Sequence, residues 1–242
     1  MSKKTLAGKR VVITGGTDGI GKEAALAFLA AGAEIAIGDS DAGRVRAVTN
    51  QFNRIHSGTA LGLPLDVTDS VRFAEFLSTA EQKLGGLDVV VNAAEILPTS
   101  SFLSEFDTDT DLQIEVNLRA VITGSRLAGA RFIEQGHGQI VNIGSAVGVT
   151  AALGAAVYSA TKHAVVGLGT ALHRGLAEQG VIVSTVAPGF EPDAEAVADA
   201  IVDCVEHRRG GLLVVPPSGW FRTAMPDPVH LRHTMRRMLG IM

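Results

Sequence analysis

The sequence has little cysteine, few aromatic residues and no long apolar run. Cys204 is its one cysteine, so no internal disulfide can form and a cysteine metal cluster is excluded. No apolar run reaches the roughly 18 residues that a membrane-spanning helix needs, and the start, Met1 to Arg10, is polar. The seven histidines show no H-x-x-x-H or similar ligand spacing, so we expect no metal site. We therefore expect a cytoplasmic protein without bound metal.

Charge is modest but uneven along the chain. The net charge is -4, and from His207 onward six arginines face one acidic residue, which leaves -9 for residues 1–206. No aromatic-rich or groove-reading motif accompanies this basic tail, so we expect no nucleic-acid binding. Hydrophobic residues make up 46% of the chain and charged residues 19%, which is enough apolar surface for a large core.

Short β-branched runs alternate with longer segments of helical period. This pattern indicates an α/β protein with a parallel sheet covered by helices on both faces. Strands are expected at residues 10–14, 34–38, 60–65, 87–92, 139–143, 181–186 and 212–215. Helices are expected at residues 20–31, 42–55, 70–84, 109–135, 155–178, 194–206 and 229–239. Right-handed crossovers then predict a single-domain, Rossmann-type, doubly wound sheet of seven parallel strands, with its ligand crevice at the carboxyl ends of the strands.

A glycine-rich turn follows the first expected strand. It reads Thr14-Gly15-Gly16-Thr17-Asp18-Gly19-Ile20-Gly21 and leads into a helix. Glycines permit a tight turn whose N–H groups approach a pyrophosphate, and the helix N-terminus favours that negative charge. A P-loop does not fit, because Glu23 stands where a serine or threonine is required. Gly19 to Ala24 match the dinucleotide pattern G-x-G-x-x-G/A. A glycine-rich turn that binds no ligand is the alternative.

Asp39 ends the second expected strand, about 20 residues beyond the glycines. A carboxylate there is placed to accept hydrogen bonds from the hydroxyls of an adenosine ribose. It would also repel a 2′-phosphate, and the glycine turn contains no arginine or lysine to bind one. The sequence therefore favours NAD over NADP. The alternative is that Asp39 only starts a turn.

Tyr158 and Lys162 are four residues apart in a segment of helical period, so their side chains share one helix face. At about 4 Å and an effective dielectric constant of about 20, the ammonium would stabilise a phenolate by about 4 kcal/mol. That energy lowers the pKa of the phenol by roughly three units, before desolvation opposes it. Ser145 follows the fifth expected strand, and its hydroxyl is placed to hold a substrate oxygen. The three residues together predict a site of proton transfer.

These features resemble the short-chain dehydrogenase/reductase family over nearly the whole chain. The motifs that carry the resemblance are Thr14 to Gly21, Asp66-Val67, Asn92-Ala93-Ala94, Asn117, Ser145, Tyr158 with Lys162, and Pro188-Gly189. It implies one domain over residues 1–242, in which residues 1–135 mainly bind the dinucleotide and residues 136–242 mainly form the catalytic and substrate side. It also implies a homo-oligomer that associates through the long helices holding Asn117 and Tyr158.

The resemblance also implies a role for each site residue. Tyr158 would be the acid/base, Lys162 would bind the nicotinamide ribose and acidify the tyrosine, Ser145 would hold the reacting oxygen, and Asn117 would support a water-linked proton path. The residues expected to bind the cofactor are Gly15, Thr17, Asp18, Gly19, Ile20, Gly21, Asp39, Asp66, Val67, Asn92, Ala93, Ala94, Tyr158, Lys162, Pro188 and Gly189. The substrate would be a small alcohol or ketone.

The sequence departs from the family pattern in two places. The usual N-N-A-G is Val91-Asn92-Ala93-Ala94 here, followed by Glu95. We expect Glu95 to lie near the crevice mouth and to disfavour anionic substrates, unless it is a solvated loop carboxylate. After Pro188-Gly189 little of the family's helical lid remains, so either the pocket is open or the basic, methionine-rich tail covers it or a neighbouring subunit. We favour such packing over binding of the tail to a membrane surface.

Two function classes follow from these observations. The first is an active oxidoreductase that interconverts a secondary alcohol and a ketone with NAD(P). The second is a nucleotide-binding regulatory or scaffold protein of the same fold without turnover, which the altered Ala94-Glu95 region and the missing lid favour. A nucleotide-sugar epimerase or dehydratase is disfavoured, because its longer C-terminal substrate region is not expected here.

Overall fold

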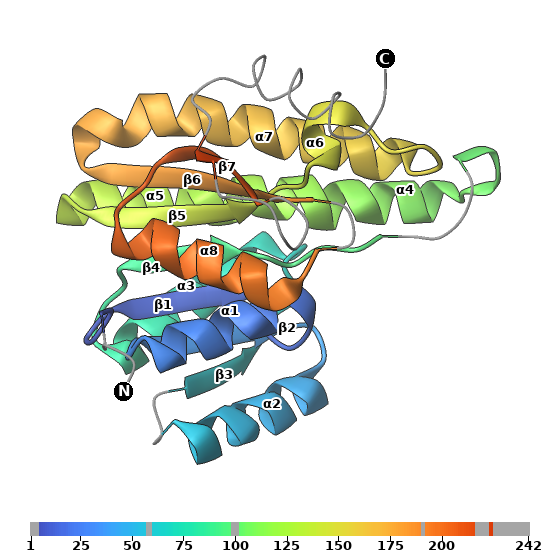
Figure 1. Cartoon of the computed structure of the whole chain (residues 1–242). Coiled ribbons are helices and arrows are strands. Elements are labelled where there is room, and N and C mark those ends of the chain that lie inside the picture. The colour runs from blue at the N-terminus through green and yellow to red at the C-terminus, as the bar shows by residue number, and fades with distance from the viewer. Residues whose placement is uncertain (1–4, 57–59, 98–101, 190–191, 216–222, 225–242) are drawn as a thin grey trace.

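The computed structural model describes residues 5–56, 60–97, 102–189, 192–215 and 223–224. Its centre is one sheet with the strand order β3-β2-β1-β4-β5-β6-β7-β8 (Figure 1). The strands are β1 (Arg10–Thr14), β2 (Glu34–Asp39), β3 (Ala60–Pro64), β4 (Val89–Asn92), β5 (Gly138–Ile143), β6 (Val181–Pro188), β7 (Gly211–Val215) and β8 (Thr223–Ala224). The first seven strands are parallel, which confirms the predicted seven-stranded, doubly wound α/β fold. The two-residue β8 pairs antiparallel to β7 and was not predicted.

Helices cover both faces of the sheet (Figure 1). One face carries α1 (Gly19–Ala30), α2 (Ala42–Ile55) and α8 (Ala194–Glu206), and the other carries α3 (Ser70–Leu84), α5 (Ala120–Gln135) and α7 (Ala156–Leu176). Aspartates cap four of these helices at their N-termini, as Asp69 does for α3 by accepting hydrogen bonds from the N–H groups of Val71 and Arg72. Glycines in the left-handed conformation follow α3 and α5, where the sequence predicted the ends.

Two apolar clusters fill the space between the sheet and its helices. On the face of α1, Phe28 and Ile201 of α8 are fully buried beside Ile13 and Ile37 of the sheet. On the other face, Phe73 and Phe132 pack against strand residues of the same sheet. Because both faces are covered, the central strands β4 and β5 are buried along their whole length.

The expected helix at residues 109–135 is three segments in the structure. They are α4 (Asp107–Ile114), a π-helical turn, η2 (Glu115–Arg119), and α5. Such turns inside helices occur frequently at functional sites, and this one contains Asn117. A short helix, α6 (Val147–Thr150), and the 3-10 turns η1 (Phe102–Ser104) and η3 (Ala177–Gln179) were also not predicted. The helix expected at residues 229–239 lies outside the described residues.

The topology creates a switch point between β1 and β4. Chain connections from β1 lead toward β2 and β3, and those from β4 lead toward β5, β6 and β7. Loops after β1 and β4 therefore separate at the carboxyl edge of the sheet and leave room for a ligand between them. In the described ranges, no helix is long and apolar enough to cross a membrane, and no three metal-ligating side chains are grouped to hold an ion.

Candidate active site

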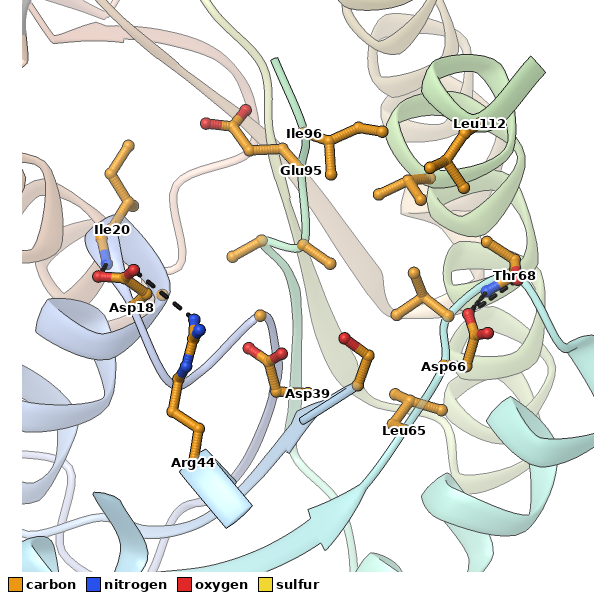
Figure 2. A pocket seen from close by; sticks show the side chains of 18 residues that line it. Asp18, Ile20, Asp39, Arg44, Leu65, Asp66, Thr68, Glu95, Ile96 and Leu112 are labelled. Atoms are coloured by element: carbon orange, nitrogen blue, oxygen red, sulfur yellow. Dashed lines mark hydrogen bonds and ion pairs between the residues drawn. The ribbon is translucent and has the colours of Figure 1, made fainter. Parts of the chain in front are cut away.

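A cleft of about 550 Å³ lies at the carboxyl ends of β1, β2 and β4 (Figure 2). Asp39 and Arg44 lie at one end of it and Glu95 with Ile96 at the other. Ten of the sixteen residues predicted to bind the cofactor line this cleft: Gly15, Asp18, Gly19, Ile20, Gly21, Asp39, Asp66, Val67, Ala93 and Ala94. Its position is the one predicted for a ligand at the switch point.

The glycine turn between β1 and α1 is packed tightly on one side and open on the other. A Cβ on Gly15, at φ +67°, would lie 2.7 Å from the Cα of Ala94, and one on Gly21 would lie 2.1 Å from the Gly15 carbonyl oxygen. Gly19, at φ +50°, has open space where its Cβ would be. Any side chain at Gly15 or Gly21 would therefore push the turn apart.

Asp39 is held at the end of β2 by the turn itself. The Thr17 hydroxyl donates a 2.5 Å hydrogen bond to an Asp39 carboxylate oxygen. Thr17 is buried and does not line the cleft. It therefore orients Asp39 from the protein interior and not from the ligand side. Arg44, from the first turn of α2, also lines the cleft, and its guanidinium lies 3.8 Å from Asp18 and 4.0 Å from Asp41. Sequence reasoning missed Arg44 because it considered only the glycine turn.

Asp66 and Val67 line the side of the cleft beyond β3. The Asp66 carboxylate accepts hydrogen bonds from the backbone N–H and the hydroxyl of Thr68, at 2.9 and 2.8 Å, and this turn appears in Figure 2. Leu65 and Ile96 add apolar surface to the cleft. The wall opposite the glycines thus combines a polar turn with flat apolar contacts, which suits an aromatic ring.

The loop after β4 is fixed at both ends. The Thr14 hydroxyl oxygen accepts hydrogen bonds from the N–H groups of Ala93 and Ala94, at 3.1 and 3.3 Å. The Asn117 carboxamide bonds both the N–H and the carbonyl of Ile96, each at 2.8 Å. Asn117 is 1% exposed, so the π-helical turn places its amide against this loop. The polar atoms of its side chain bind main chain here.

Asn92 also points away from the cleft. Its carboxamide N–H donates to the Asn142 carboxamide oxygen at 2.8 Å, and the Ser125 hydroxyl lies 3.4 Å away. Asn92 therefore joins β4, β5 and α5 beneath the cleft, and its side chain does not line it. The sequence motif suggested contact with a ligand because it identifies a loop and does not show which side chains turn inward.

Ser145 lies in the turn between β5 and α6 and is 8% exposed. Its hydroxyl oxygen accepts a hydrogen bond from the N–H of Val147 at 3.2 Å. The Pro188 carbonyl accepts from the N–H of Ala146 at 2.7 Å, and the Gly189 N–H donates to the Val215 carbonyl at 2.8 Å. Pro188 thus supports the Ser145 turn from the end of β6, whereas Gly189 bonds the end of β7. Residues 190–191 lie outside the described ranges, and α8 begins at Ala194.

Tyr158 and Lys162 project from the same side of α7 toward the loop after β4. The Tyr158 hydroxyl donates to a Glu95 carboxylate oxygen at 3.4 Å. The same oxygen lies 2.5 Å from the Lys162 ammonium, which also donates to the Ile143 carbonyl at 3.1 Å. The ammonium nitrogen is 5.4 Å from the centroid of the Tyr158 ring. Because Glu95 lines the cleft, these contacts place the tyrosine and the lysine at its edge.

The environment of Tyr158 corrects one expectation. Burial and the negative charge of Glu95 raise the pKa of Tyr158, and the hydrogen bond to Glu95 adds to that rise, whereas a hydrogen bond with Ser145 opposes it. The sequence predicted a lowered pKa from Lys162 alone. That prediction set aside burial of the phenol and also lacked Glu95, whose contact with the ammonium no spacing rule could reveal. Glu95 is also more than a solvated loop residue, since its side chain is only 36% exposed and ion-paired.

Comparison with known proteins places this site in a family. Residues 9–197 match the short chain dehydrogenase family. A 2,5-dichloro-2,5-cyclohexadiene-1,4-diol dehydrogenase of Sphingobium indicum is 34% identical over 184 residues, which are 76% of this chain and 73% of the relative. An uncharacterized oxidoreductase of Staphylococcus aureus is 31% identical over 194 residues, 80% of this chain and 82% of that protein.

Solved structures show the same fold. A short chain dehydrogenase from Mycobacterium smegmatis superposes with a TM-score of 0.83 at 27% identity, covering 91% of this chain and 95% of that one. A 3-ketoacyl-(acyl-carrier-protein) reductase from Brucella melitensis, complexed with NADH, gives a TM-score of 0.80 at 23% identity, covering 87% and 97%. With the family match spanning most of the chain, the protein belongs to the short-chain dehydrogenase/reductase family of NAD(P)-dependent oxidoreductases.

Proposed function

We propose that the protein interconverts a secondary alcohol and a ketone, with NAD as the hydride carrier and Tyr158 as the acid/base. The observation that carries this proposal is the meeting of three groups. The Tyr158 hydroxyl and the Lys162 ammonium both contact Glu95, and Glu95 lines the glycine-walled cleft. An ionisable phenol at the edge of a nucleotide-sized cleft is an arrangement suited to proton transfer beside a cofactor.

The residues of the cleft fit a dinucleotide. Gly19 begins α1 and offers open space at the helix N-terminus, where a pyrophosphate charge is favoured. Asp39 is oriented by Thr17 at the far end, where it would accept hydrogen bonds from ribose hydroxyls. A bound nicotinamide ring would supply or accept the hydride. Lys162 would hold the adjoining ribose once its ammonium is released from Glu95.

The protein's own residues would handle the proton. Ser145 would hold the substrate oxygen with its hydroxyl. During reduction the Tyr158 hydroxyl would donate its proton to that oxygen, and during oxidation the phenolate would take the proton back. The Asn117 amide is committed to Ile96, so we assign it the role of fixing the loop that carries Glu95.

Asp39 supports NAD over NADP. Its carboxylate lines the cleft and would repel a 2′-phosphate. Arg44 is the cation at this end of the cleft, but its guanidinium already lies near Asp18 and Asp41. A 2′-phosphate would therefore meet the Asp39 carboxylate beside a guanidinium that already lies near two other carboxylates. Association of the protein with further copies of itself through the helical segments that hold Asn117 and Tyr158 stays a prediction of the family resemblance.

A substrate panel followed by NADH absorbance tests the proposal. Because one relative is named as a dehydrogenase of a cyclic diol, the panel starts with cyclic secondary alcohols and the matching ketones, each tried with NAD and NADP. We expect turnover with at least one neutral alcohol–ketone pair and a higher kcat/KM with NAD. A protein that binds NADH but turns over no member of the panel would contradict it.

A nucleotide-binding protein without turnover is the second candidate. The ion pair between Glu95 and Lys162 favours it, because this contact occupies the ammonium that a ribose would need. Binding of NADH without turnover, both in the parent protein and after the Glu95→Gln substitution, would support this candidate. Turnover in the parent protein would exclude it, whereas turnover in Glu95→Gln alone would show that the ion pair silences the site.

A further inference from the structure

One carboxylate oxygen of Glu95 contacts both ionisable groups of α7. It lies 2.5 Å from the Lys162 ammonium nitrogen and 3.4 Å from the Tyr158 hydroxyl. The ammonium nitrogen itself is 5.4 Å from the centre of the phenol ring. The carboxylate is thus in direct contact with both the hydroxyl and the ammonium. A lysine that would otherwise favour the phenolate is paired with a charge that opposes it.

The place of Glu95 follows from main-chain contacts on both sides of it. Thr14 binds the two N–H groups that precede it, and Asn117 binds the N–H and carbonyl of Ile96, which follows it. Four hydrogen bonds therefore define the path of the loop after β4. The fold therefore places the main chain of Glu95 beside α7, within reach of its side chain.

Lys162 needs this partner. Its side chain is 2% exposed, and a buried ammonium is costly unless a counter-charge and hydrogen bonds compensate for the water it has lost. Glu95 supplies the charge and the Ile143 carbonyl supplies a further hydrogen bond. Glu95 itself is 36% exposed, so water can reach the carboxylate and a ligand in the cleft can displace it.

We propose that Glu95 is a positioning residue that neutralises Lys162 and holds Tyr158 as a neutral proton donor until a ligand in the cleft displaces the carboxylate. Among the residues that the structure describes, the ionisable groups beside the phenol are Glu95 from the loop after β4 and Lys162 one turn further along α7, with the Ser145 hydroxyl also bonded to it. The raised pKa of Tyr158 agrees with this geometry. The free site is therefore set for protonating a carbonyl oxygen.

The catalytic consequence rests on the proposed function. In alcohol oxidation the C–H hydride passes to NAD⁺ and the O–H proton passes to the phenolate of Tyr158, so the rate depends on how much phenolate is present. Burial and the charge of Glu95 together make that form abundant only at high pH. We therefore expect the rising limb of kcat/KM for oxidation to lie at high pH and to move to lower pH without Glu95.

A direct test uses the fact that Tyr158 is the one tyrosine in the chain. The near-ultraviolet absorbance of tyrosinate in the ligand-free protein then reports this residue alone, while circular dichroism follows unfolding. In the parent protein we expect tyrosinate to appear only as the chain unfolds at high pH. In Glu95→Gln, and in Glu95→Ala as a second variant, Tyr158 should ionise in the folded protein, at a pH about one to three units below the parent's tyrosinate midpoint.

Two further variants serve as controls. Glu75→Gln removes an exposed carboxylate of α3 and should leave the titration as in the parent, which excludes an effect of net charge. Adding Lys162→Met to Glu95→Gln should move the midpoint back up, because the ammonium acts on the phenol once the carboxylate is gone. A parent protein that ionises near pH 10 while folded, or Glu95 variants that titrate like the parent, would overturn the proposal.

The titration and the substrate panel separate the two proposals. If the Glu95 variants shift the tyrosinate midpoint but no substrate is turned over, the role of Glu95 stands and the proposed function fails. If substrates are turned over but the midpoint and the pH profile of oxidation do not move, the proposed function stands and the role of Glu95 is wrong.

Discussion

Two ion pairs lie at opposite ends of the same central strands and are built differently. At the amino-terminal end, the Arg10 guanidinium and backbone N–H bind Asp88 with hydrogen bonds of 2.8 to 3.2 Å. At the carboxyl end, Lys162 meets Glu95 through a single contact. In the first pair the buried partner is the carboxylate, 8% exposed, and in the second it is the cation.

This difference indicates that the Arg10–Asp88 pair stabilises the fold, whereas the Lys162–Glu95 pair serves the candidate active site. Burial alone would raise the pKa of Asp88, but the hydrogen bonds and charge of Arg10 outweigh it and hold that pKa below its ordinary value. Asp88 thus has its hydrogen-bonding capacity largely filled and joins β1 to β4. The Lys162–Glu95 pair lies beside an ionisable phenol and a cleft, and its partly exposed carboxylate can be replaced. Substitution in a functional pair should lower activity with little loss of stability, whereas substitution in a structural pair should lower the free energy of unfolding.

The largest expected effect belongs to the carboxyl-end pair. Lys162→Met should lower kcat by about 10²- to 10³-fold, because a positioned charge at the reacting groups is removed. The free energy of unfolding should change by only about 1 kcal/mol, since methionine fills a similar volume without a buried charge. Steady-state kinetics and denaturant unfolding measure the two quantities. Loss of stability with retained turnover would reverse the assignment of the two pairs.

Asp88→Asn should show the opposite pattern. Removing the carboxylate leaves the Arg10 guanidinium without its partner and should lower the free energy of unfolding by about 3 kcal/mol, while kcat per folded molecule stays as in the parent. Lys9→Ala is the matched control, because its ammonium lies 3.9 Å from Asp88 on an exposed side chain and should cost less than about 1 kcal/mol. Equal losses of unfolding free energy in both variants would show that the buried Arg10–Asp88 contacts stabilise the protein no more than an exposed ion pair does.

The smallest expected effect is the pH dependence of the contribution that Asp88 makes to the free energy of unfolding. The pKa of Asp88 is lower in the folded protein than its ordinary value of 3.8, so its contribution is present above about pH 4 and is lost as the pH falls through the folded-state pKa. The difference in unfolding free energy between the parent and Asp88→Asn should be constant near neutrality and shrink below about pH 4. A difference that stays constant into acid would mean that Asp88 is not the titrating group.

Much of the fold was predictable because its signals are local. Buried parallel strands appear as short β-branched runs, and the helix expected at residues 70–84 ends before the glycine Gly85 in the structure too. The two-residue β8 and the π-helical turn at Asn117 were not predictable, because tertiary contacts impose them on segments without a matching periodicity. The long helix was therefore expected in one piece.

The site was predictable in its positions and less so in its contacts. Strand order placed Gly19, Asp39 and Ser145 at one edge of the sheet. It did not show that Asn92 turns away from the cleft, that Arg44 reaches it from α2, or that Glu95 contacts Lys162. Those facts depend on side-chain direction in loops, which neither spacing nor hydrophobic period determines.

The central claim is that Tyr158 transfers a proton beside a bound dinucleotide, and Tyr158→Phe tests it most directly. The substitution removes one hydroxyl from a side chain that is not part of the cleft lining around the glycine turn. Measured on one preparation, the NADH dissociation constant should stay within a few-fold of the parent value, while kcat falls by about 10²- to 10⁴-fold. Turnover at the parent rate, or loss of NADH binding in place of turnover, would contradict the account.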